Sequence, residues 1–121
     1  MRSLYDQNNR IRLWFHGPTS CLVDLGGNPV AVIKGEVVHN LRCEPVGSWK
    51  WESVFDFDGK MLLKKGLTED GPGPRLVPLS AMPRCDTGDI RPQARKPWGS
   101  ELAFVETLRL VSRDYRLNGL I

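Results

Sequence analysis

Three carboxylates recur at nearly constant spacing in the first half of the chain, and acids arranged in this way could hold a metal or act as acid–base groups. Asp6, Asp24 and Asp56 each follow two apolar or aromatic residues, and Asn40 takes the same place in a fourth copy of the pattern. An amide serves a turn as well as a carboxylate does, but it is a poor acid. We therefore interpret all four as side chains that accept hydrogen bonds from backbone N–H groups at turn entrances.

The histidines and cysteines could also carry chemistry, but their spacing supports no known site. His39 and Cys43 are candidate metal ligands, yet zinc sites normally bring closely spaced ligand pairs, and the chain has none. A nucleophilic pair of Cys43 or Cys85 with a histidine has no supporting motif. We therefore predict no catalytic residues, no metal and no cofactor. In an enzyme, the plausible acid–base groups would be His16, His39, Asp86 and Asp89.

The cysteine count also bears on the cellular compartment. Cys21, Cys43 and Cys85 are an odd number at wide spacing, which is more typical of reduced thiols than of a disulfide framework. The first residues lack the apolar segment of a signal peptide. No apolar run approaches the ~18 residues that a membrane span needs. These features predict three free thiols in a cytoplasmic protein without a transmembrane segment.

Aromatic and arginine side chains are better candidates for a binding site. The chain has four tryptophans in 121 residues, and these either fill a core or line an apolar cavity or an interface. The polar stretch from Arg84 to Arg91 is either an exposed loop or a rim that binds an anionic group. The candidate ligand-binding residues are Trp14, Trp49, Trp51, Arg84, Arg91 and Trp98. The net charge is only +3, and nucleic-acid binders show denser basic stripes, so we do not expect a nucleic acid as partner.

The spacing of the repeated pattern indicates the elements that position these residues. The repeated residues are Asp6, Asp24, Asn40 and Asp56, and each has turn-type residues after it and apolar residues on both sides. Each copy predicts a short β-hairpin, and the pairs Asn8-Asn9 and Asp58-Gly59 indicate two-residue turns of the primed type. One hairpin cannot bury its apolar face alone, so four must share a core. Closure of about eight strands into a barrel or ring removes exposed edges.

Single residues refine this picture. Pro29 and Pro45 each fall five residues after the repeated Asp or Asn, and we expect each to begin a strand because proline cannot donate to a ladder. Lys34-Gly35 is expected to form the return turn between two units. Residues 49–56 alternate strictly and are the clearest strand prediction, with Trp49, Trp51, Ser53 and Phe55 on one face.

The second half of the chain has a different character. Residues 71–99 contain six of the nine prolines and predict an extended strap or linker rather than long helices. After Ser100, which can cap a helix, apolar residues follow helical spacing from about Glu101 to Arg116. A strand there would place Glu106 on the apolar face. The predicted organisation is one domain over residues 1–121, with hairpin repeats at 3–70, a strap at 71–99 and a helix at 100–117.

The segment Leu22-Val23-Asp24-Leu25-Gly26-Gly27-Asn28-Pro29-Val30-Ala31-Val32-Ile33 and the segment Val54-Phe55-Asp56-Phe57-Asp58-Gly59 resemble the bacterial four-fold β-flower domain. The resemblance extends from Ser3 to about Lys65, and Asn9 and Cys43 depart from the glycine of the pattern. It implies a small pseudo-symmetric β-barrel with an apolar interior, similar to lipid-binding tubby-type barrels. It implies no activity and no catalytic residues.

Three hypotheses about function follow. The first is a binding module for a small apolar or amphipathic ligand such as a lipid, with the tryptophans around it. The second is a protein-interaction or homo-oligomerisation module that uses the helix, the proline-rich segment or both. The third, which the sequence supports least, is an enzyme.

Overall fold

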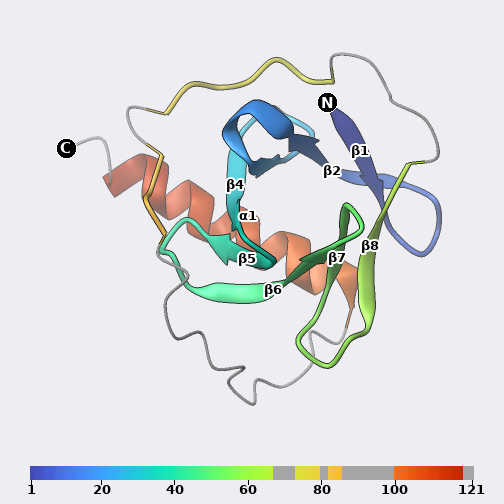
Figure 1. Ribbon diagram of the computed structural model, residues 1–121. Helices are drawn as coiled ribbons and strands as arrows, with labels where there is room; N and C mark the ends of the chain where they lie inside the picture. Colours follow the sequence, from blue (N-terminus) through green and yellow to red (C-terminus); the bar gives the residue numbers. More distant parts are fainter. Residues whose placement is uncertain (67–72, 80–81, 86–99, 119–121) are drawn as a thin grey trace.

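Eight antiparallel strands form a closed barrel, and one long helix packs across one of its ends (Figure 1). The computed structural model describes residues 1–66, 73–79, 82–85 and 100–118. Each strand pairs with its neighbours in sequence, and the last strand pairs with the first. The elements are β1 (Arg2–Tyr5), β2 (Ile11–His16), the 3-10 helix η1 (Gly17–Thr19), β3 (Cys21–Val23), β4 (Pro29–Lys34), β5 (Val37–Asn40), β6 (Pro45–Lys50), β7 (Ser53–Phe55), β8 (Met61–Lys65) and α1 (Glu101–Asn118). The predicted β-rich barrel of hairpin repeats with a C-terminal helix is confirmed.

Each of the four hairpins, β1–β2, β3–β4, β5–β6 and β7–β8, carries an irregularity at the same place. The pairing register shifts immediately before the repeated Asp or Asn in every copy. The positions of these shifts are Leu4/Tyr5, Leu22/Val23, Val38/His39 and Val54/Phe55. A bulge bends its strand and increases the local twist, which helps a short sheet to close. The repeat seen in the sequence is therefore a repeat of local backbone structure.

The interior of the barrel is filled by aliphatic side chains from all eight strands. Fully buried members include Leu4, Leu13, Leu22, Val30, Val38, Val54 and Leu63. From α1, Phe104, Val105 and Leu108 join the same cluster and close the barrel on the side of the hairpin turns. Ser100 caps this helix, since its Oγ accepts a hydrogen bond from the Ala103 N–H at 3.1 Å.

The helix is fastened to the hairpin-turn end by polar contacts to three of the four turns. Gln7 contacts Glu101 through its backbone N–H, Arg42 forms an ion pair with Asp114 at 2.9 Å, and Asp24 lies 3.8 Å from Arg109. The buried Ser112 hydroxyl donates to the Pro29 carbonyl at 2.7 Å. The predicted helix is thus present, and it extends two residues beyond Arg116.

The opposite end of the barrel carries the return connections between repeats. Here Phe15 packs on Trp49 with ring centroids 4.7 Å apart. Glu52 accepts ion pairs from Arg2 at 3.1 Å and from Lys65 at 3.8 Å. An aromatic pair and a small charge cluster therefore occupy this end.

The prediction of one strand over residues 49–56 is wrong. A tight turn at Trp51 and Glu52 divides it into β6 and β7, and the two arms pair through Lys50 and Ser53. Both turn residues have positive φ, 52° and 56°, which is the signature of a type I′ hairpin. The local pattern of these residues favours a strand. The turn forms because β6 and β7 must each pair with a neighbouring strand for the barrel to close.

Other local predictions have mixed outcomes. Pro29 and Pro45 do begin β4 and β6. The return turn expected at Lys34-Gly35 lies one residue later, at Gly35 and Glu36. The division of the chain at residue 70 and the arrangement of residues 71–99 stay predictions, because residues 67–72, 80–81 and 86–99 lie outside the described part.

Candidate functional site

The four repeated Asp and Asn side chains hold the hairpin turns together. In each copy one side-chain oxygen, Oδ1, accepts hydrogen bonds from the backbone N–H groups two and four residues later, at 2.8 to 3.0 Å. The backbone N–H three residues later donates to the carbonyl of the same Asp or Asn. The four side chains are buried, between 1% and 6% exposed. The interpretation of these residues as turn-forming groups is confirmed.

The turns themselves differ from the predicted two-residue primed type. Only the third residue after the Asp or Asn has a positive φ, with values of 59° to 87°. These residues are Asn9, Gly27, Cys43 and Gly59. A β-turn followed by one left-handed residue and a bulge is the three-residue alternative for hairpins. The side chain of the Asp or Asn favours it, because it binds the backbone N–H groups inside the loop.

Asp6 has one further partner. Burial raises the pKa of this carboxyl, but the backbone N–H of Arg10 and the guanidinium of Arg12 outweigh burial and lower the pKa below its usual value. Arg12 Nε donates to Asp6 Oδ2 at 2.6 Å. Asp6 is therefore a charged structural group. Among the described residues, no group of three or more His, Cys, Asp and Glu side chains could hold a metal ion.

The two histidines lie in different environments. His16 is half-buried, and its Nδ1 lies 2.7 Å from Thr19 Oγ1, which in turn lies 2.9 Å from Cys21 Sγ. Cys21 is buried, and burial raises the pKa of its thiol, so this thiol is a poor nucleophile. His39 is completely buried on β5. Asp86 and Asp89, the remaining acid–base candidates, lie outside the described residues.

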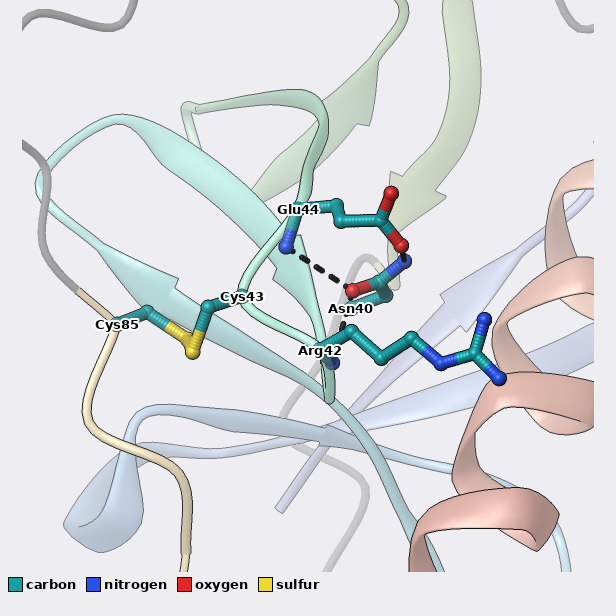
Figure 2. Close-up of a disulfide and its surroundings, with 5 residues drawn as sticks. All are labelled: Asn40, Arg42, Cys43, Glu44 and Cys85. Atoms are coloured by element: carbon teal, nitrogen blue, oxygen red, sulfur yellow. Dashed lines mark hydrogen bonds between the residues drawn. A yellow bond between two sulfur atoms is a disulfide. The ribbon is translucent and has the colours of Figure 1, made fainter.

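Cys43 and Cys85 form a disulfide, which overturns the prediction of three reduced thiols (Figure 2). It also removes both cysteines as nucleophiles, and Cys21 is the one free cysteine. Figure 2 shows Cys43 beside Asn40 in the turn between β5 and β6, and Cys85 on the segment that follows the barrel. Disulfides persist mainly in oxidising compartments, so the disulfide gives no support to the cytoplasmic location, which stays a prediction.

The segment 73–85 is here called the strap, and the disulfide is one of the contacts that its described residues make with the barrel. Residues 73–79 and 82–85 of the strap are described. Gly73 lies against Met1 and Trp14, and the Val77 N–H donates to the Gly27 carbonyl at 2.8 Å. The strap therefore meets the third residue of two successive hairpin turns, Gly27 and Cys43. Figure 1 shows it crossing outside the barrel on the side of β2 and β4.

The described tryptophans lie in three different places. Trp14 is half-buried under the strap, Trp49 packs inside the barrel end against Phe15, and Trp51 is 78% exposed in the β6–β7 turn. Trp51 was expected in a strand and is not in one. Arg84 is exposed on the strap. Arg91 and Trp98 lie outside the described residues, so the structure brings none of the described candidates together.

Two surface hollows gather other side chains. The first lies on the outer face of β6 and β7, holds about 220 Å³, and is lined by Ser48, Lys50, Trp51, Phe55, Asp56, Phe57 and Gly59. The Trp51 and Phe55 rings meet edge to face at 6.0 Å. We call this hollow the aromatic hollow. Sequence analysis placed Trp51 and Phe55 on one face but missed Phe57, which follows the repeated Asp of the fourth copy.

The second is a groove between α1 and the turn from Asp24 to Asn28. It comprises two adjoining spaces of about 200 and 190 Å³. The charged side chains that line it are Arg12, Asp24, Glu106, Arg109, Arg113 and Arg116. We call it the arginine groove. Apolar residues at helical spacing imply that the opposite face of α1 is polar, but nothing in the sequence indicates that this face meets the second hairpin turn.

Comparison with known proteins agrees with this architecture. Neither a curated protein nor a solved structure matches the chain significantly. Within the described part of the chain, no helix has the length and apolar character needed to cross a membrane. A family model described as 4-fold beta flower protein matches residues 2–105, which include all eight strands. The chain therefore belongs to the 4-fold beta flower family.

Proposed function

We propose that the protein is a protein-interaction module that binds an extended peptide segment of a partner in the aromatic hollow. The observation that carries the proposal is the placement of Trp51. This residue is 78% exposed and has a φ of 52°, a left-handed conformation that is costly for a bulky side chain. Trp51 follows Asn40 by the same interval at which Gly35 follows Asp24, so Gly35 is its equivalent in the second repeat. A large ring at a place where glycine would be more stable is typical of a binding contact.

The surroundings of Trp51 suit an interface. Phe55 and Phe57 are half-buried beside it, and Met61, which pairs with Phe55, is 38% exposed. Lys50 adds a charged group at the edge. Rigid aromatic side chains bury much area at a low entropic cost, and tryptophan is enriched among the residues that dominate binding energy. An apolar ligand inside the barrel has less support, because aliphatic side chains fill the interior.

The internal repeat indicates the kind of partner. In the second repeat, the chain's own strap runs as an extended segment over the hairpin turn and hydrogen-bonds to Gly27. The aromatic hollow includes Gly59, which is the equivalent of Gly27 in the fourth repeat. Among the described residues, no atom lies within 4 Å of the position that a Cβ on Gly59 would take. An extended segment with proline and aliphatic residues, like Pro74 to Pro78, would fit this free position.

Selection from a displayed library of short peptides tests the proposal. We expect enriched peptides that contain proline and aliphatic residues and that bind Trp51→Gly at least about tenfold more weakly than the parent protein, as expected for loss of an aromatic anchor. Leu117→Ser is the matched control, because Leu117 is 65% exposed on α1 and its loss also removes exposed apolar surface. Failure to enrich any peptide, or equal binding to Trp51→Gly, would refute the proposal.

The same variant has an expected effect on folding. Glycine at position 51 relieves the left-handed strain, worth about 1–2 kcal/mol, and costs about 0.5–1 kcal/mol in backbone entropy. We expect the free energy of unfolding of Trp51→Gly to equal that of the parent or to exceed it by up to about 1.5 kcal/mol, as measured by urea denaturation. A stable variant that has lost binding would separate the role of Trp51 in recognition from a role in folding.

A further inference from the structure

The arginine groove has the composition of an anion-binding site. Four arginines and two carboxylates line it, so the lining carries a net charge of +2. Both carboxylates lie beside Arg109: Glu106 pairs with it at 3.0 Å, and Asp24 Oδ2 lies 3.8 Å from it, while Asp24 Oδ1 accepts two turn N–H groups at 2.9 Å. A further acid, Asp6, is held by Arg12. The positive charge of the groove is therefore only partly balanced.

The arginines also keep donors that the protein does not use. A guanidinium carries five N–H donors. Among the described residues, Arg12 uses its Nε towards Asp6, and Arg116 uses its Nε and Nη1 towards the Ser112 carbonyl and Asn28. Arg109 uses its Nη1 towards Glu106, and its Nε faces Asp24, which leaves its Nη2 free among the described residues. Arg113 is exposed and has no partner in the described part of the chain. Arg109, Arg113 and Arg116 follow one another at a spacing of three to four residues and lie on one face of α1. Their guanidinium N–H groups can therefore point into the same groove.

The rim of the groove is apolar. Leu25 and Leu102 line its first part and are 56% and 48% exposed, and Leu110 lines the second part and is 61% exposed. Leu25 lies in the second hairpin turn, opposite the helix. A site for inorganic phosphate alone would not need three exposed leucines around it. Arginine forks at the centre and leucines at the rim are complementary to an anion that carries an apolar group.

We infer that the arginine groove binds an organic phosphate, in which a phosphate monoester is joined to an apolar group. The phosphate oxygens accept from Arg109, Arg113 and the free edge of Arg116, and the apolar group lies against Leu25 and Leu102. A phosphate is favoured over a monocarboxylate because its charge and its three terminal oxygens match several arginines at once. This site lies on the helix side of the barrel and does not depend on the aromatic hollow.

Calorimetric titration with four probes tests the inference: hexyl phosphate, inorganic phosphate, hexanol and hexyltrimethylammonium. We expect hexyl phosphate to bind best, inorganic phosphate more weakly, and the other two not measurably. Exposed Arg109 and Arg113 can be removed together without opening the core. Arg109→Ala/Arg113→Ala should lower the affinity for both phosphates at least about tenfold, since it removes charge-assisted hydrogen bonds to the phosphate oxygens.

Two further variants complete the experiment. Lys34→Ala removes one positive charge from the return-turn end of the barrel and should leave the affinity within twofold of the parent. Leu102→Ser should weaken hexyl phosphate but leave inorganic phosphate unchanged. The inference is overturned if hexyl phosphate does not bind the parent, if the double arginine variant binds it as tightly, or if inorganic phosphate binds as well as hexyl phosphate.

Discussion

Two sides of the barrel wall are built from copies of the same hairpin but differ in how far their outer surface is buried. The residue before each repeated Asp or Asn points out of the barrel. It directly follows a core residue, and successive side chains of a strand point to opposite faces; these core residues are Leu4, Leu22, Val38 and Val54. In the second and third repeats this residue, Val23 or His39, is completely buried. In the fourth and first repeats, Phe55 and Tyr5 remain half-exposed.

The strap contacts the two repeats in which this residue is buried. It contacts the second repeat at Gly27 and the third at Cys43, and it is the described segment that lies outside the barrel on this side. The equivalent positions of the other two repeats are Asn9, which is exposed, and Gly59, which faces open space. The repeat thus supplies four similar outer surfaces, of which the described part of the chain covers two and leaves two uncovered.

Removal of the Cys43–Cys85 disulfide should have the largest effect on how the strap covers the barrel. Cys85→Ser frees the far end of the strap, and loss of a disulfide that closes a loop of 42 residues is expected to cost about 2–4 kcal/mol of unfolding free energy. Cys43→Gly should cost about 1 kcal/mol less, because glycine relieves the positive φ of 62° at this position. Urea denaturation of both variants under non-reducing conditions measures the difference. Equal stability of Cys85→Ser and the parent would show that the strap is not fastened by this bond.

A matched pair of glycines isolates the middle contact of the strap. Gly27 and Gly59 have the same φ of 87° in equivalent turns. Gly59→Ala should cost only the left-handed strain, about 1–2 kcal/mol. A Cβ on Gly27 would collide with the Arg75 carbonyl oxygen, so Gly27→Ala should cost a further 1–3 kcal/mol or so from overpacking. Thermal unfolding of the two variants compares them directly, and equal losses would mean that the strap does not press on the second turn.

A smaller and pH-dependent effect should come from His39. Burial lowers the pKa of this histidine, and the nearby charge of Lys34 lowers it further. The backbone of Val32 and of Val37 lies near enough to the ring to offset part of this lowering, but among the described residues neither ring nitrogen forms a hydrogen bond of good geometry. The unfolded state binds a proton near pH 6.5, whereas the folded state resists it. The contribution of His39 to stability is therefore intact above pH 6.5 and falls as the pH decreases, by at most about 1.4 kcal/mol per pH unit.

His39→Phe places the residue of the fourth repeat in the third. It should raise the unfolding free energy at pH 7 by about 1 kcal/mol, because it removes an unsatisfied buried polar group. The unfolding free energy should also become less dependent on pH between pH 6.5 and 5. Unfolding curves over this range, compared with those of the parent, provide the measurement. A variant whose stability still falls with the parent's slope would assign the pH dependence to another group.

The sequence predicted the parts of the fold that depend on repetition. The four copies of the pattern, three with Asp and one with Asn, identified four hairpins, one shared core and the turn role of Asp6, Asp24 and Asp56, because each copy contains its own turn residues. The break at Trp51 was missed because alternation between residues 49 and 56 is a local signal. Alignment of the second and third copies on their Asp and Asn maps Trp51 onto Gly35 and could have located the break. The local alternation predicts a continuous strand here, whereas the repeat predicts a turn. The strand pairing of the barrel requires the turn.

The candidate sites were harder to predict. The pairing of Cys43 with Cys85 depends on where a nonrepeating segment lies on the barrel, and cysteine spacing does not determine disulfide connectivity. The arginine groove likewise depends on the docking of α1 against the second turn. Phe57 and Arg109 gain their surroundings only from tertiary structure. Their residue types alone indicate an aromatic loop position and a solvated helix face.

The pairing of β1 with β8 has a consequence for the order of assembly. This ladder joins only Leu4 to Lys65 and Tyr5 to Lys64, whereas β4 and β5 pair over four residues. Neighbouring hairpins can pair through contacts between residues close in sequence. The β1–β8 ladder instead requires the two ends of the barrel segment to meet, and contacts between residues far apart in sequence form slowly during folding. The first strand should thus be the last to join the sheet. Its amide hydrogens should also be the first to exchange when the barrel opens locally.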